Sequence, residues 1–127
     1  MKKFATAFGA ALLLCGCAGV RHPPASAPSP VDMLVGWISF RGEFLLYPRQ
    51  EDLGRTLDQS CTSGTFARVA DFRSAARRFE GKRVRVIGRL MKADAYFSDS
   101  TLGQRIENYC GSDTVLIATS VEPAPPQ

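Results

Sequence analysis

The sequence contains little of the chemistry on which most enzymes depend. It has one histidine, His22, and no Cys-x-x-Cys pair, Gly-x-Ser-x-Gly, His-Glu-x-x-His or phosphate-binding glycine-rich motif. A lone histidine among prolines has no preorganised partner for acid–base catalysis or metal binding. Acidic residues are present, but five surface acids are no more than solubility requires: Glu43, Glu51, Asp52, Glu107 and Asp113. We therefore expect no enzyme, no cofactor and no metal.

The sequence also lacks a hydrophobic run that could span a bilayer, and it lacks a concentrated excess of one charge. Its longest apolar run, Phe4 to Leu14, has 11 residues, whereas a membrane helix needs about 20. The 16 Lys and Arg residues exceed the 12 Asp and Glu residues, but removal of Lys2 and Lys3 with a leader leaves 14 − 12 = +2. Acids and arginines are interleaved, so we expect no nucleic-acid partner.

Residues 1–16 have the organisation of an export signal. Met1-Lys2-Lys3 supplies the positive start, and the apolar run up to Leu14 supplies the hydrophobic centre. This leader is an address for export and is too short for a transmembrane helix.

The four residues Leu14-Cys15-Gly16-Cys17 follow that run and resemble the lipobox of bacterial lipoproteins. The resemblance implies cleavage before Cys17, acylation of Cys17, and a mature chain of 127 − 16 = 111 residues attached to a membrane. Because Ala18 follows the cysteine where an inner-membrane retention signal has Asp, the resemblance also implies the periplasmic side of the outer membrane. An ordinary secretory signal with two incidental cysteines is the alternative.

Proline-rich segments flank the part of the chain that we expect to fold. Residues 17–31 carry prolines at positions 23, 24, 28 and 30, which predicts an extended spacer after the lipid. Residues 32–122 are expected to form one β-rich domain, and residues 123–127 a disordered tail.

Two cysteines are left once the leader and the lipidation site are set aside. Cys61 and Cys110 would stand in a compartment that oxidises thiols, so we expect a disulfide between them. Closing a loop of about 50 residues stabilises a fold by roughly 4 kcal/mol in the chain-entropy model. A catalytic thiol or half of a metal site is the competing interpretation, but neither cysteine has neighbours that such a site requires.

The pattern of apolar residues predicts strands around one helix. Residues 34–40 and 43–47 are β-rich runs separated by Arg41-Gly42, which fits either a hairpin or a glycine bulge in one bent strand. Apolar residues spaced by three and four predict a helix over 66–79, ended by Gly81. Strict alternation predicts a strand over 82–91, and residues 114–121 read as a buried strand. Residues 49–65 read mostly as loop, with a short strand or turn expected at 95–98 and a helical turn at 102–109.

This order favours an α+β, mainly β fold: a small curved antiparallel sheet or partly open barrel with one packed helix. The segment from Phe79 to Leu90, with Gly81-Lys82 followed by alternating valines and then Gly88, resembles a strand of bacterial oligonucleotide/oligosaccharide-binding (OB) folds. That resemblance covers about a dozen residues. The whole chain also resembles small proteobacterial lipoproteins, a resemblance that implies no activity.

A row of arginines is the most specific polar feature of the sequence. Arg83, Arg85 and Arg89 lie on one face of the predicted strand, about 6–7 Å apart for each two residues, so they could follow the charges of a polyanion. Trp37 or Tyr47 could stack on a sugar or a base. Alternatively, the guanidinium groups pair with acids such as Glu43 or Glu107 and protect an edge strand, and Trp37 belongs to the core.

Two classes of function stay open on this basis. The first is a non-catalytic binding or adaptor module of the cell envelope, which would recognise an envelope protein or glycan. The second is a structural lipoprotein that has no small ligand. A binder of an anionic glycan or oligonucleotide through an OB-type surface is a further, less favoured alternative.

Overall fold

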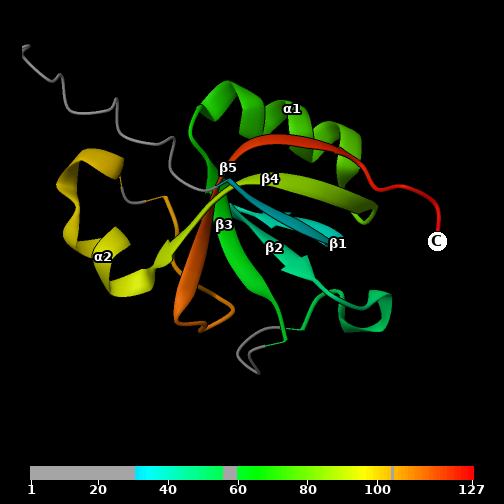
Figure 1. Cartoon of the computed structure of the whole chain (residues 1–127), viewed down its shortest axis with the longest axis horizontal. Coiled ribbons are helices and arrows are strands. Elements are labelled where there is room, and N and C mark those ends of the chain that lie inside the picture. Colours follow the sequence, from blue (N-terminus) through cyan, green and yellow to red (C-terminus); the bar gives the residue numbers. More distant parts are fainter. Residues whose placement is uncertain (1–30, 56–59, 104) are drawn as a thin grey trace, which may run out of the picture.

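The computed structural model describes residues 31–55, 60–103 and 105–127, and five strands account for much of this part of the chain (Figure 1). The strands are β1 Asp32–Arg41, β2 Glu43–Tyr47, β3 Thr62–Phe66, β4 Arg83–Lys92 and β5 Thr114–Pro123. The helices are α1 Val69–Phe79 and α2 Ala93–Ser98, with 3-10 turns at Gln50–Asp52 and Ser100–Leu102. The predicted export signal, Cys17, His22 and the spacer as far as residue 30 lie outside the described residues.

The five strands close into a barrel in the order β1-β2-β3-β5-β4, with β4 returning to β1. All pairs are antiparallel except β3 with β5, which run parallel. The helix α1 connects β3 to β4 and lies across one end of the barrel (Figure 1). This arrangement confirms the predicted mainly β, OB-like barrel with one packed helix.

The barrel core is formed by side chains that alternate along the strands. Val84 and Val86 on β4 are fully buried, whereas Arg83 and Arg85, which alternate with them, face outward and are partly exposed. Gly88 continues the inward row at a point where β5 approaches closely, because a Cβ there would lie 2.2 Å from the carbonyl oxygen of Ile117. The alternation that predicted the strand therefore also fills the barrel.

The helix α1 closes the barrel with its apolar face. Ala75 and Phe79 are buried, and the Phe72 ring packs edge-on against Phe40 and Phe66, with centroids 5.3 and 6.3 Å away. The helix begins at Val69, three residues later than predicted, because Phe66 belongs to β3. It ends before Gly81, whose positive φ of 73° suits glycine.

Several local expectations are settled or corrected by the structure. The run from Asp32 to Tyr47 is a hairpin, with Gly42 at φ 75° in its turn. The expected loop over 49–65 includes most of the strand β3, which pairs with β2 on one side and with β5 on the other. Residues 95–98 belong to the helix α2 rather than to a strand, and the short 3-10 helix ends at Leu102, where the predicted helical turn would begin.

The C-terminal residues, for which we predict disorder, are held to β4 at two points. The amide of Ala124 donates to the carbonyl of Arg83, and a guanidinium nitrogen of Arg83 donates to the carbonyl of Pro125. Within the described ranges, no helix has the length and apolar character that crossing a bilayer requires.

Candidate functional site

The predicted arginine row lies on the outer face of β4, but two of its members are bonded within the chain. Arg85 pairs with Glu122, its cross-strand neighbour on β5, at 2.6 Å between nitrogen and oxygen. Arg83 donates to Pro125 at 2.9 Å. The acid that Arg85 meets is therefore Glu122, and not the expected Glu43 or Glu107.

Arg89, the third member of the row, is exposed near the end of β4 that leads to α2. Hydrogen bonds from the side chain and backbone of Thr101 lower the pKa of Asp99, and the charge of Arg89 adds a smaller effect in the same direction. Arg83 and Arg85 thus have separate partners within the chain, and none of the three arginines lines the cavities described below.

The two candidate stacking residues belong to an apolar cluster outside the barrel. Tyr47 is fully buried, and its hydroxyl donates to the carbonyl of Arg55 at 2.7 Å. Trp37 is half-buried and packs against the cluster formed by Leu45, Tyr47, Cys61 and Cys110. The Tyr47 ring therefore has no exposed face on which a sugar or base could stack.

The predicted Cys61–Cys110 disulfide is present, with the two Cα atoms 5.3 Å apart. It joins the residue before β3 to the long β4–β5 connection. Leu45 and Tyr47, on the outer side of the barrel, are buried against this disulfide, while Phe44 and Leu46 on the same strand belong to the barrel core. In OB folds the outer face of strands 2 and 3 is the usual binding surface, and in this protein its own chain covers that surface at β2.

Residues 107–110 of the β4–β5 connection, together with the disulfide, form what we call the cover of β2. Glu43 also holds this cover in place, a role that was not predicted. Its carboxylate is 1% exposed and accepts hydrogen bonds from three successive backbone amides, those of Glu107, Asn108 and Tyr109, at 2.8, 3.0 and 2.7 Å. The hydroxyl of Ser63 also donates to it at 3.2 Å and accepts from the amide of Cys110.

Glu43 is thus not one of the surface acids that solubility requires. It is a buried anion in a nest of backbone amides, which the positive φ of 61° at Asn108 helps to form. The sequence around Glu43 does not distinguish it from an exposed acid beside a turn, because its backbone donors lie 64 to 66 residues further along the chain.

A small cavity lies beside this cover, between the β1–β2 turn and the β4–β5 connection. Its volume is about 160 Å³, below the 300–1,000 Å³ typical of ligand pockets. Two of the groups at its rim already have partners: Arg105 donates to the carbonyl of Ala67, and the hydrogen bond from Tyr109 to Glu107 raises the pKa of that phenol. This cavity has little capacity for a ligand.

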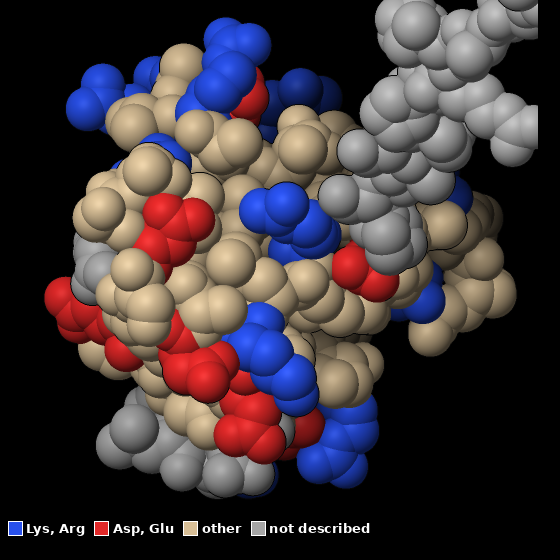
Figure 2. Space-filling view, turned by 60° about the vertical axis from the view of Figure 1, so that its left-hand side comes forward, with Lys and Arg blue, Asp and Glu red and all other residues tan. Residues whose placement is uncertain are grey.

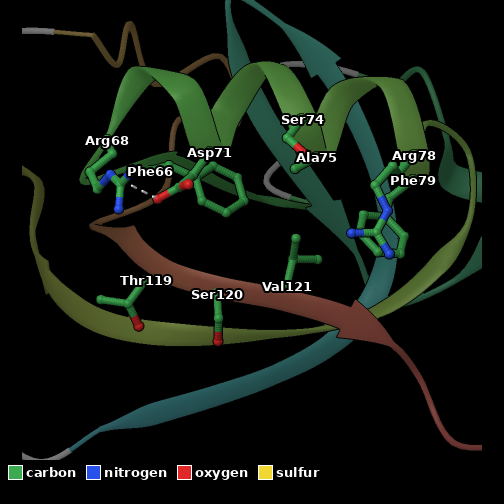
Figure 3. A pocket seen from close by; sticks show the side chains of 10 residues that line it. All are labelled: Phe66, Arg68, Asp71, Ser74, Ala75, Arg78, Phe79, Thr119, Ser120 and Val121. Carbon is green, nitrogen blue, oxygen red and sulfur yellow. Dashed lines mark ion pairs between the residues drawn. The ribbon is translucent and has the colours of Figure 1, made fainter.

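A larger groove of about 370 Å³ runs between α1 and the second half of β5 (Figure 3). Arg68, Asp71, Ser74 and Arg78 line it from the helix side, and Thr119 and Val121 from the strand side. Arg68 pairs with Asp71 at 3.6 Å, while the Arg78 guanidinium lies 5.0 Å from the centre of the Phe79 ring. In Figure 3, Val121 points from β5 toward the helix.

The strand side of this groove is an open edge. The pairing of β3 with β5 ends at Phe66 and Ala118, and the amide of Ala67 makes the last bond to the Ala118 carbonyl. From Thr119 to Pro123, β5 pairs within the described part of the chain with β4 alone. If β3 were longer, its extension would therefore lie in the groove under α1, beside the part of β5 that follows Ala118.

A third depression, of about 640 Å³, lies beside α2 and is lined only by exposed or half-exposed residues, among them Lys92, Asp94 and Asp113.

The described residues contain no group of three His, Cys, Asp or Glu side chains that could hold a metal ion. No protein-family model and no curated protein matches this sequence. The groove under α1 is therefore the candidate site that the geometry favours.

Proposed function

We propose that this protein is a lipoprotein of the outer membrane, attached on the periplasmic side through Cys17, whose OB-like barrel is a non-catalytic binding or adaptor module. The sequence Leu14-Cys15-Gly16-Cys17 supports the anchor. The Cys61–Cys110 disulfide supports an oxidising compartment, because such bonds persist where thiols are not kept reduced. The partner is an envelope protein or glycan.

The observation that carries the binding role is the groove between α1 and β5. It combines a volume of about 370 Å³ with an unpaired strand edge and cationic side chains. A purely structural lipoprotein is the second candidate, and the engagement of Arg83 and Arg85 within the chain favours it over an OB-type polyanion binder.

Mass spectrometry of the membrane fraction tests the anchor. We expect a mature chain that begins at Cys17 and carries three acyl chains, and we expect Cys17→Ser to give a soluble protein or an unprocessed precursor. A soluble product that starts at another residue would contradict the anchor. A photocrosslinker at Thr119, compared with one at exposed Glu51, then tests whether a partner contacts the groove.

A further inference from the structure

The groove under α1 offers backbone hydrogen-bonding groups that the fold leaves unused. In the described structure β5 has β4 on one side along its whole length, but β3 on the other side only as far as Ala118. The four further residues Thr119 to Glu122 span about 13 Å at about 3.3 Å per residue. Because residues along a strand direct their N–H and C=O groups alternately to its two sides, about half of these residues face the open edge and the others face β4. An unpaired edge of this kind is a template for another strand.

Little apolar surface is exposed beside this edge. Phe66 and Phe79 line the groove but are almost fully buried, so Val121, which points into it from β5, is the partly exposed apolar side chain there. In an added strand every second side chain would face Val121, since successive side chains point to opposite sides. The remaining side chains would face outward, toward the rim of the groove.

The helix side of the groove carries a small cationic excess. Arg68 and Arg78 line it against Asp71, which is 2 − 1 = +1, and the rest of the segment 68–82 adds Arg73, Arg77 and Lys82 against Glu80 outside the groove lining. Asp71 pairs with Arg68, and Glu80 accepts hydrogen bonds from Ser39 and from the amide of Phe40 on β1. Figure 2 shows Lys and Arg side chains gathered at the upper end of the molecule, where α1 lies in Figure 1.

These features select one kind of occupant. A single-stranded nucleic acid would bind to cations with aromatic platforms, but the two phenylalanines at the groove are 1% and 5% exposed and present no ring face. A sulfated glycan would leave the backbone groups of the open edge without partners. A second copy of the chain, paired edge to edge, would bring two cationic rims together. An extended peptide satisfies the open edge, and acidic side chains on it complement Arg68 and Arg78.

We infer that the groove binds an extended, acidic segment of a partner protein, which adds to β5 as a strand at Thr119–Pro123 and directs its carboxylates to the rim of α1. This is recognition by strand addition, in which main-chain bonds give affinity and the side-chain pattern gives specificity. It rests on the proposed binding role and names the partner class for it.

Selection from a library of random linear peptides tests the inference on the purified full chain. The library is first depleted on the Arg78→Gln variant and is then selected on the unchanged protein. We expect enriched peptides in which Asp or Glu alternates with Val, Ile or Thr. Enrichment of peptides that lack acidic residues, or no enrichment at all, would overturn the inference.

One enriched peptide then serves as the probe in a titration. Methylation of its alternate backbone nitrogens should abolish binding, because it removes the donors that pair with the edge. Ser74→Glu, at the groove, should weaken binding about tenfold by opposing the carboxylates and neutralising Arg78. The matched variant Val69→Glu places the same charge on α1 at an exposed residue that does not line the groove and should change little.

Two other outcomes would overturn strand addition. If the N-methylated peptide binds as well as its parent, or if a sulfated glycan competes at equal charge concentration, the surface recognises polyanions by charge alone. If no peptide binds while Cys17 is acylated and a crosslinked partner maps to another surface, the inference fails and the proposed function stands. A protein that is neither acylated nor crosslinked to any partner would instead contradict the proposed function.

Discussion

The outer side of β2 and the free edge of the second half of β5 are two surfaces of the barrel strands, and they differ in what lies over them. The outward-facing side chains of β2, Leu45 and Tyr47 among them, are buried beneath a cover that the Cys61–Cys110 disulfide and the Glu43 carboxylate hold in place. Residues 119–123 of β5 pair on one side only within the described structure and border a groove. The surface by which OB folds usually bind is thus occupied, and a different edge is open.

This difference shows that proteins with the same fold can leave different surfaces accessible for binding. The barrel places its strands in the OB order, but the length of β3 and the path of the β4–β5 connection decide which surfaces stay accessible. An argument from the fold alone would assign the ligand to the face of β2 and β3. The contacts of this chain cover that face at β2, and we therefore propose the side of α1 as its binding surface, since function resides in the site rather than in the fold.

The largest expected effect concerns the disulfide of the covered face. Replacing Cys61 and Cys110 with Ser should lower the free energy of unfolding by about 4 kcal/mol, because the closed loop of about 50 residues no longer restricts the unfolded chain. Denaturant unfolding under oxidising conditions measures this loss. Equal transition midpoints for the variant and the unchanged protein would mean that the disulfide does not stabilise the cover.

Removal of the buried carboxylate should have the next largest effect. Glu43→Ala leaves the amides of residues 107–109 without their acceptor, so we expect a loss of about 3 kcal/mol. Glu51→Ala is the matched control, because that carboxylate is 71% exposed and its removal should cost about 0.5 kcal/mol at most. Similar losses for the two variants would contradict the role of Glu43 in holding the cover.

The ion pair between Arg85 and Glu122 should contribute less. Both side chains are partly exposed, at 35% and 44%, so solvent screens their attraction and a coupling of up to about 1 kcal/mol is expected. A double-mutant cycle with Arg85→Gln and Glu122→Gln measures it by thermal or denaturant unfolding. Loss of peptide binding in Arg85→Gln would show that the recognition surface extends beyond the groove.

The smallest expected effect is a shift in the pKa of Tyr109, a residue of the cover. The phenol of Tyr109 donates to Glu107, which raises its pKa, so Glu107→Gln should lower that pKa toward its ordinary value near 10. A raised folded-state pKa contributes stability that is present below the unfolded-state value and is lost as the pH rises through the folded-state value. Spectrophotometric titration of tyrosine ionisation follows the shift, and an unchanged curve would exclude this hydrogen bond.

The elements that the sequence predicted are those whose signal is local. The alternation along 82–91 and the spacing of Phe72 and Phe79 lie within single elements, so they identify β4 and α1 without knowledge of the fold. The strand β3, with the sequence Thr-Ser-Gly-Thr-Phe, reads as a loop. It becomes a strand through its pairing with β2 and β5, and β5 lies about fifty residues further along the chain.

The sites were less predictable than the fold for the same reason. The donors to Glu43 are 64 to 66 residues away in sequence, so nothing near Glu43 identifies them. The groove exists because β3 ends at Phe66 while β5 continues to Pro123, which is a difference between two strands rather than a motif. The arginine row was correctly placed on one face of β4, but its partners depend on the register with β5.

The contrast between a covered β2 and an open β5 edge is tested most directly by mapping where an acidic peptide binds. Amide chemical shifts of the labelled full chain, recorded with and without the selected peptide, give this map. We expect the amides of Thr119–Glu122 and the groove-lining residues of α1 to shift while those of Leu45 and Tyr47 stay unchanged. Shifts centred on β2 and on residues 107–110, with β5 and α1 unaffected, would contradict the account.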